Sequence, residues 1–255
     1  MTDRPLRLFV HKTSSASLRV TIYLSVANVP DSLVELVQMG MGADHRGIPK
    51  YLMPEGDPVT EALGTTDLSA FNPESRIPVL LLPDGRKMTQ SGAIIDYLRA
   101  LHGDGGVEPA DPWQRAEMRR IMWIVAADIQ PYQNIPFIIQ SMTEWGMDRA
   151  MPTEHPLRLH FIRREFSAIE GLLARCAGTC AVGDTVTLAD CFLVPQVRNA
   201  LMAGIDLPVE FPILSRVFDH VTEVPAIKRV LDDAGGKIQP AFFDAKKMAA
   251  YAGST

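Results

Sequence analysis

The stretch FNPESRIPVLLLPDGRKMTQSGAIIDYLR, residues 71–99, contains strand, turn and helix signals in one continuous order. The apolar run 79–82 predicts a strand, the Asp-Gly pair at 84–85 a hairpin turn, and 87–89 the returning strand. The apolar residues that follow, over 94–98, have the spacing of one helix face. This order predicts a β-hairpin that leads into a helix at the edge of a sheet.

Two places in this segment can bind an extended ligand. Pro78 permits a cis bond after Ile77, which would leave the N–H and C=O of Ile77 free to pair with a ligand strand. Gln90 and Ser91 stand where the helix begins, and a hydroxyl with unpaired backbone N–H groups at a helix N-terminus attracts a carboxylate. The segment therefore predicts a site for a short peptide that carries a carboxylate.

The N-terminal residues supply a second part of this site. A strand is predicted over 6–10 and a helix over 17–28, with Thr13, Ser14 and Ser15 between them. A hydroxyl at a helix N-terminus can donate to a bound thiol and stabilise its thiolate, since the helix end already favours negative charge. A free thiol titrates near about 8.5, and each unit of depression corresponds to about 1.4 kcal/mol. One hydroxyl and a helix end could therefore ionise a bound thiol at neutral pH.

Both segments resemble the glutathione site of the glutathione transferase family. SSASLRVTIYL, residues 14–24, is similar to the serine-rich motif of the zeta class, which contains maleylacetoacetate isomerase and its maleylpyruvate relatives. The resemblance implies that Ser14 stabilises the thiolate of glutathione, the cosubstrate, with Ser15 beside it as the other catalytic candidate. The zeta motif usually has cysteine where this chain has Ala16.

The same resemblance implies the remaining contacts to glutathione. Ile77 and Pro78 would pair with its backbone, and Gln90 and Ser91 would hold its γ-glutamyl end. No metal is implied at any of these positions.

A change in the sequence pattern along the chain predicts two domains. The Gly- and Pro-rich stretch 103–112 ends the β-rich pattern, and helical periodicity follows over 113–130 and 157–176. With the resemblance, this predicts an α/β thioredoxin-like N-terminal domain over 1–103 that binds glutathione. An all-α helical domain over 104–255 would bind the substrate.

One helix start in the second domain is interpreted as structural. Thr187 can cap the helix that follows, and Asp190, three residues on, can close a capping box. Asp190 is therefore not a catalytic candidate.

Composition excludes several classes of protein. The 255 residues carry a net charge of −5 and have a pI near 5.7, which gives no electrostatic footprint for nucleic acid. No apolar run approaches the roughly 18 residues that a membrane span needs, and the N-terminus shows no signal-peptide pattern. The three cysteines have spacings unlike those of a zinc site and indicate a reducing compartment. These features predict a cytoplasmic enzyme, and the family implies a homodimer.

Departures from the zeta pattern concern the substrate pocket. Zeta isomerases act on dicarboxylates, and the family has arginines where this chain has Thr13, Ile135-Pro136 and Met202. An unpaired carboxylate in an apolar pocket is strongly disfavoured. Gln130 and Asn134, in a stretch that resembles the segment facing the zeta cleft, are further pocket candidates.

A second departure is the long connection 39–70, which is predicted to be a Gly/Pro-rich loop that forms a wall or lid. In it, His45 and Lys50 are candidates for binding the glycyl carboxylate of glutathione. Three other cations could replace the missing arginines of the pocket: His11, Lys12 and Arg198.

The apolar replacements favour attack of glutathione thiolate on a small apolar or aromatic electrophile, by conjugation or by displacement of an ether or halide. The alternative within the family is glutathione-dependent cis-trans isomerisation of the maleylacetoacetate or maleylpyruvate type. An alternative of another class is a non-catalytic glutathione-binding or stress protein. Aromatic compound catabolism or detoxification would be the setting of the enzyme.

Overall fold

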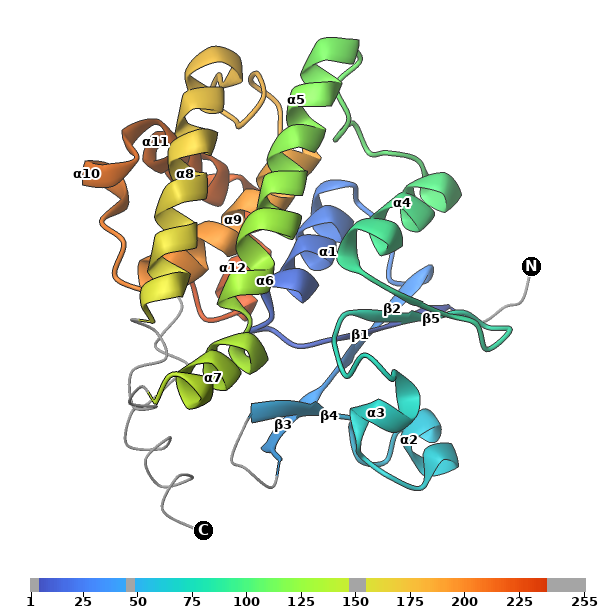
Figure 1. Ribbon diagram of the computed structural model, residues 1–255. Helices are drawn as coiled ribbons and strands as arrows, with labels where there is room; N and C mark the ends of the chain where they lie inside the picture. The colour runs from blue at the N-terminus through green and yellow to red at the C-terminus, as the bar shows by residue number, and fades with distance from the viewer. Residues whose placement is uncertain (1–4, 45–48, 147–154, 238–255) are drawn as a thin grey trace. The chain divides into compact units, whose positions relative to one another are not determined.

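The computed structural model describes residues 5–44, 49–146 and 155–237 (Figure 1). The chain divides into two units, residues 1–105 and 106–255. The sequence suggested a boundary two residues earlier, after Gly103. Gly105 closes the first unit at φ +63°, and a Cβ there would lie 2.5 Å from Cβ of Ala27. The chain can pass this close to Ala27 only as glycine.

A four-stranded sheet in the order β2-β1-β5-β6 forms the base of the first unit. β1 is parallel to β2, and the pairs β1–β5 and β5–β6 are antiparallel. Leu8 and Leu80 are paired across β1 and β5, and both are fully buried. The hairpin predicted around residue 84 is confirmed. The strands are β1 (Leu6–Val10), β2 (Val34–Gln38), β5 (Val79–Leu81) and β6 (Lys87–Thr89).

Two helices of the first unit, α1 (Ser15–Val26) and α4 (Ser91–His102), pack against each other. α4 buries the predicted apolar face that includes Ile94, Ile95 and Leu98. α1 begins two residues earlier than the periodicity predicted, because Ser14 is extended and caps the helix. The serines of the motif therefore stand at the first turn of α1.

The connection 39–70 is not the loop that the sequence predicted. Its described residues form an antiparallel hairpin and two short helices, and Figure 1 shows them grouped beside the main sheet. A Cβ at Gly42 would lie 2.7 Å from Leu52, so glycine lets the two strands of the hairpin meet. The elements are β3 (Gly40–Ala43), β4 (Pro49–Leu52), α2 (Pro58–Leu63) and α3 (Leu68–Phe71).

This inserted segment shares a core with the sheet. Phe9 of β1 and Phe71 of α3 lie with their ring centroids 4.8 Å apart, and Met53, just after β4, is buried in the same cluster. Tyr51 of β4 is half-buried against the cluster. The inserted segment is therefore part of the hydrophobic core of the first unit and is not a loop on its surface.

The described part of the second unit is helical, and none of its helices, nor those of the first unit, is long and apolar enough to cross a membrane. The predicted helix over 157–176 is confirmed as α8. The elements are α5 (Pro112–Trp123), η1 (Ile124–Ile129), α6 (Gln130–Gln133), α7 (Ile135–Glu144), α8 (Pro156–Cys176), α9 (Leu188–Met202), α10 (Leu207–Glu210), α11 (Pro212–Glu223) and α12 (Pro225–Asp233).

The prediction of one uniform helix over 113–130 is wrong in its second half. The chain winds as a π-helix, η1, over 124–129, and the N–H of Gln130 donates to the carbonyl of Val125, five residues earlier. Pro131 has no N–H to continue an α-helical ladder. The wider turn accommodates this break without ending the helical course.

Asp190 closes the capping box at the start of α9, as the sequence predicted. Its Oδ2 accepts from the N–H and the hydroxyl of Thr187, at 2.8 and 3.0 Å, and its Oδ1 accepts from Ala181 N at 2.8 Å. Burial raises the pKa of Asp190, and only 1% of the residue is exposed. The carboxylate therefore ties the loop before α9 to the helix.

Candidate active site

Ser14 and Ser15 lie side by side at the N-terminus of α1, and each is 8% exposed. Ser14 Oγ accepts from the N–H of Ser17 at 3.2 Å, which is the ordinary N-cap bond. A serine hydroxyl has one hydrogen and two lone pairs, so this bond leaves the Ser14 hydrogen available to donate. An anion near it would also meet the positive end of α1.

Thr13, predicted for the substrate pocket, bonds to His11 two residues earlier, and its contact with substrate stays a prediction. The N–H of Thr13 donates to His11 Nδ1 at 3.3 Å, so Nδ1 carries no hydrogen and the Thr13 hydroxyl, 2.7 Å away, donates to it as well. Burial, with the adjacent charge of Lys12, lowers the pKa of His11. His11 is therefore neutral at pH 7 and is not the cation that the sequence allowed at this place.

Tyr51 of β4 completes a group of side chains around Ser14, and sequence analysis did not single it out. Its ring centroid lies 5.5 Å from that of His11. Burial raises the pKa of Tyr51, although hydrogen bonding with Ser14 and Thr13 acts in the opposite direction. The phenol is therefore protonated at neutral pH and reaches the hydroxyls at the start of α1.

The Ile77–Pro78 bond is cis, as the sequence allowed, and both residues are buried beside the start of β5. At the other end of the hairpin, Gln90 caps α4 with φ +70°, a backbone region that glycine favours and that is often retained at functional sites. Ser91 is the first residue of α4 and is 7% exposed.

Glu74 is a second residue that sequence analysis missed here. Gln90 Nε2 donates to one of its carboxylate oxygens at 3.1 Å, and the Thr89 hydroxyl donates to the other at 3.0 Å. An exposed carboxylate thus stands beside the N-terminus of α4. The Glu74 carboxylate can accept from an ammonium group, and the N–H groups at the start of α4, next to it, can donate to a carboxylate.

Of the two cations predicted for the glycyl end of glutathione, His45 lies outside the described residues. Lys50 Nζ pairs with Asp67 at 3.0 Å and links β4 to the start of α3. Hydrogen bonds from the Ser69 backbone and from Lys50 lower the pKa of Asp67 to about 2. Lys50 is thus a partner of Asp67, and a contact to glutathione stays a prediction.

Of the pocket residues predicted in the second unit, Gln130 and Met202 lie in helices and Asn134 lies between α6 and α7. Gln130 begins α6 and donates from Nε2 to Asn134 Oδ1 at 3.2 Å, and Met202 is the last residue of α9. Their contact with substrate stays a prediction. Arg198 of α9 is 1% exposed, and its Nη2 donates to the carbonyls of Ala234 and Gly236. Arg198 holds the end of α12 in this way, while its Nε and Nη1 have no hydrogen-bond partner among the described residues, so a contact with substrate stays a prediction.

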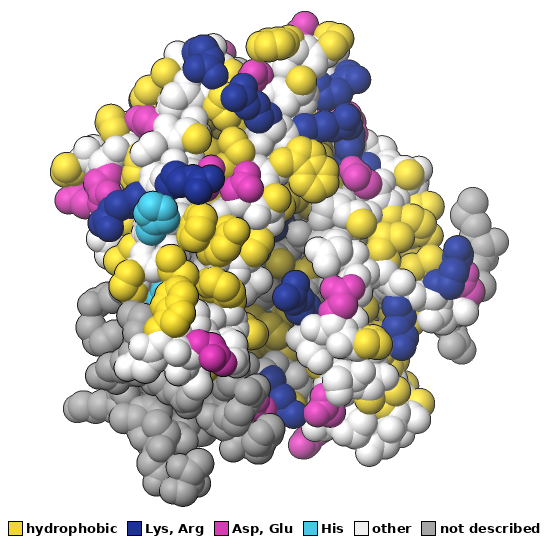
Figure 2. Space-filling view, in the orientation of Figure 1, with side chains coloured by type: hydrophobic (Ala, Val, Ile, Leu, Met, Phe, Trp, Pro, Cys, Tyr) yellow, Lys and Arg dark blue, Asp and Glu magenta, His cyan; other side chains and the backbone are white. Residues whose placement is uncertain are grey.

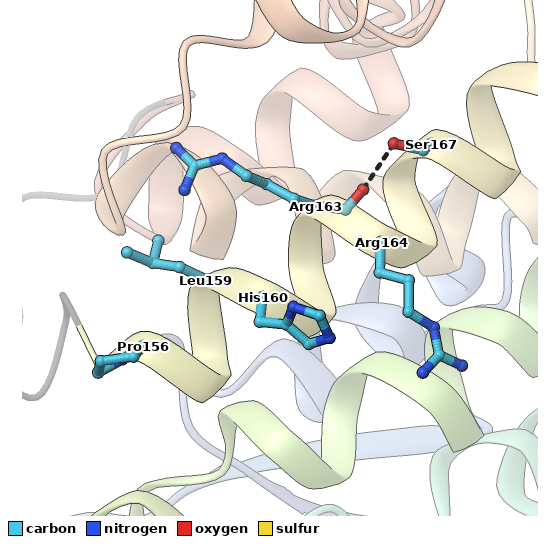
Figure 3. Close-up of a pocket in the computed structure, with 6 residues that line it drawn as sticks. All are labelled: Pro156, Leu159, His160, Arg163, Arg164 and Ser167. Atoms are coloured by element: carbon cyan, nitrogen blue, oxygen red, sulfur yellow. Dashed lines mark hydrogen bonds between the residues drawn. The ribbon is translucent and has the colours of Figure 1, made fainter.

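A depression of about 600 Å³ lies along α8, lined by residues of that helix alone (Figure 3). Arg163 in it pairs with Glu210 through Nε at 2.6 Å, and Arg164 pairs with Glu165 at 2.7 Å. On the face shown in Figure 2, basic side chains lie interspersed with acidic ones in the same way. The depression contains none of the predicted site residues.

Among the described residues, no three or more His, Cys, Asp or Glu side chains come together as a metal site.

Comparison with known proteins assigns the family. The model of the glutathione S-transferase N-terminal domain matches residues 13–101, and that of the C-terminal domain matches residues 159–225. Maleylacetoacetate isomerase from Rhizobium meliloti is 32% identical over 227 residues, which cover 89% of this chain and 95% of the relative. The chain belongs to the glutathione transferase family.

Solved structures narrow the class. A maleyl pyruvate isomerase described as a bacterial glutathione S-transferase in the zeta class has a TM-score of 0.70 and 28% identity, covering 89% of this chain and 97% of that one. Maleylacetoacetate isomerase from Anaeromyxobacter dehalogenans, with glutathione bound in its active site, has a TM-score of 0.68 and 28% identity, covering 90% and 96%. The protein is a zeta-like member of the family, and the predicted fold class is confirmed.

Proposed function

We propose that this protein is a glutathione-dependent cis-trans isomerase of the maleylacetoacetate or maleylpyruvate type. The observation that carries this is the similarity, along nearly the whole chain, to proteins named as those isomerases. Ser14 and Ser15 at the N-terminus of α1 supply the donor that such chemistry needs. The conjugation that the apolar replacements favoured becomes the second candidate.

The proposed reaction uses thiolate and returns it. Glutathione bound in the first unit loses its thiol proton, because the Ser14 hydroxyl and the positive end of α1 favour the anion. The thiolate adds to one carbon of the cis double bond, and the displaced electron pair moves to the conjugated carbonyl as an enolate. Rotation about the new single bond and collapse of the enolate expel the thiolate and give the trans isomer. No redox partner or metal enters, and glutathione is not consumed.

Glutathione would pair with the backbone of Ile77, just before β5, with its γ-glutamyl end at α4. The γ-glutamyl group carries an ammonium and a carboxylate on one carbon. In this proposal Glu74 would accept from the ammonium, and Ser91 with the N–H groups at the start of α4 would donate to the carboxylate. The domain over 104–255 would then bind the substrate, and the assembly would be a cytoplasmic homodimer.

We predict that Ser91→Ala weakens glutathione binding by roughly 1–3 kcal/mol, or about 5- to 150-fold in Kd, because a charge-assisted contact is left unmade. Turnover at saturating glutathione should change much less, since Ser91 does not touch the sulfur. Calorimetric titration measures the affinity, with Ser32→Ala, an exposed serine of the same unit, as the control. An unchanged Kd in Ser91→Ala and in Gln90→Ala would place the γ-glutamyl site elsewhere.

The substrate carboxylates need a cation, and Lys12 is the candidate nearest to Ser14 in the chain. It is exposed in the turn between β1 and α1. His11 is neutral, so it does not serve this purpose. Arg198 is a further candidate, because only its Nη2 is bound to backbone carbonyls. The second candidate function, conjugation of neutral electrophiles, is favoured by the absence of arginine at Thr13 and Met202.

Specificity constants separate the two functions. We predict that maleylacetoacetate or maleylpyruvate is turned over at least about 100-fold better than neutral aryl ethers, haloaromatics and enones. Free thiol should stay constant during the isomerisation. Lys12→Gln should raise KM for the diacid about tenfold and leave neutral compounds unaffected, since a charged hydrogen bond is lost. Rapid thiol consumption with a neutral compound, and slow isomerisation of both diacids, would establish conjugation instead.

A further inference from the structure

The inserted β3–β4 hairpin brings a phenol to the hydroxyls at the start of α1. Tyr51 stands opposite Met41 in the hairpin register, and its ring packs against the cluster that contains Phe9 and Met53. The ring of His11 lies against it at a centroid distance of 5.5 Å. Because the ring is held on these sides, its hydroxyl has a defined position beside Ser14 and Thr13.

Counting donors and acceptors in this group assigns a direction to each hydrogen. Thr13 gives its hydroxyl hydrogen to His11 Nδ1, so toward Tyr51 it can only accept. Ser14 Oγ uses one lone pair for Ser17 N–H, and keeps one lone pair and its hydrogen. Tyr51 brings one hydrogen of its own. In the group of His11, Thr13, Ser14 and Tyr51, only the Ser14 and Tyr51 hydrogens can therefore reorient.

We propose that Tyr51 is a positioning residue of the thiol site, whose hydroxyl donates to Ser14 Oγ and so directs the Ser14 hydrogen to the glutathione sulfur. This rests on the function proposed above. Without glutathione, the Ser14 hydrogen is free to point to the Tyr51 oxygen. When the glutathione sulfur accepts a hydrogen bond from the Ser14 hydroxyl, the Tyr51 hydroxyl turns to donate to the remaining lone pair of Ser14 Oγ. Both lone pairs of Ser14 are then filled, and the serine can only donate.

Such a chain strengthens the donor at its end. A hydroxyl that accepts a hydrogen bond becomes a better donor, because each bond polarises the next. The raised pKa of Tyr51 keeps the phenol protonated, as a donor must be, over the pH range in which a bound thiol ionises. Among the described residues, His11 packs on the ring with Lys12 acting on it, and Lys50, the next residue before Tyr51 in β4, is paired with Asp67.

The test is the pKa of the thiol of bound glutathione, followed by the ultraviolet absorbance of the thiolate. Tyr51→Phe keeps the ring packing and removes only the hydroxyl. We expect it to raise the bound thiol pKa by roughly 0.5–1 unit and to shift the acid limb of the kcat profile equally. The Kd for glutathione should stay within about twofold, because the peptide contacts are elsewhere. Tyr23→Phe, which removes a buried phenol that donates to Gly103 O in the same unit, should leave the thiol pKa unchanged.

The double variant distinguishes the possible failures. If Tyr51 acts through Ser14, Tyr51→Phe has no further effect on the thiol pKa in the Ser14→Ala protein. An unchanged pKa in Tyr51→Phe, or a full additional shift in the double variant, overturns the positioning role. If Ser14→Ala itself leaves the pKa unchanged, it is the proposed thiol site that fails, and the role of Tyr51 fails with it.

Discussion

Ser14→Ala is expected to lower kcat by about 10²–10³-fold, the effect of removing one preorganised donor to a reacting anion. The bound thiol should titrate nearer to the roughly 8.5 of a free thiol, so the acid limb of the kcat profile should move to higher pH. The Kd for glutathione should change little, since in the proposed site the hydroxyl acts on the sulfur, whereas the backbone of Ile77 and the start of α4 would bind the peptide.

The N-cap role of Ser14 needs its own control, because alanine at this position also weakens α1. Ser14→Ala removes the hydrogen bond that Ser17 N–H donates to Ser14 Oγ, and alanine at an N-cap costs about 0.5–2 kcal/mol of stability. Glycine at an N-cap costs only about a few tenths of a kcal/mol. Ser14→Gly and Ser14→Ala should therefore lose the same amount of turnover and differ in thermal stability. A wild-type pH profile in both variants would make Ser15 the group to test next.

Asp190→Ala is expected to destabilise the protein by about 2–4 kcal/mol without changing the chemistry. The buried N–H groups of Ala181 and Thr187 would lose their acceptor, at about 1–3 kcal/mol each. Burial raises the pKa of Asp190, so removing its charge returns part of this loss. Urea unfolding followed by circular dichroism measures the difference, and kcat per folded molecule should stay at the wild-type value.

Asp184→Ala is the matched control, since Asp184 is an exposed carboxylate six residues away that accepts from Thr179 N at 2.9 Å. It should cost no more than about 1 kcal/mol. Equal unfolding midpoints for the two variants would contradict the structural role of the capping box. A folded Asp190→Ala protein without activity would point to a catalytic role instead.

Local signals predicted the parts of the fold that local physics determines. The Asp-Gly turn at 84–85, the buried face of α4 and the Thr187–Asp190 capping box depend on residues only a few positions apart. The family resemblance also depended on short motifs, around Ser14 and Pro78, and the comparisons confirm it. Patterns of this length are visible in one sequence without any knowledge of tertiary contacts.

The features that were missed depend on contacts between distant residues. The β3–β4 hairpin contains glycines in place of β-formers, and its stability comes from packing against the sheet. Glu74 and Gln90 are 16 residues apart and Lys50 and Asp67 are 17 apart, and no local pattern pairs them. Tyr51 lay in a segment taken for a loop, so nothing in the sequence linked it to Ser14.

The π-helix η1 determines the directions in which the side chains of the following helix, α6, project. One residue more than an α-helical ladder uses is accommodated between Val125 and Gln130. Each residue of an α-helix advances the direction of its side chain by about 100°. Gln130 therefore projects from the helix about 100° away from where the periodicity of α5 would direct it. The extra residue thus acts as a fixed rotation built into the backbone, and it decides which side chains α6 presents on each side.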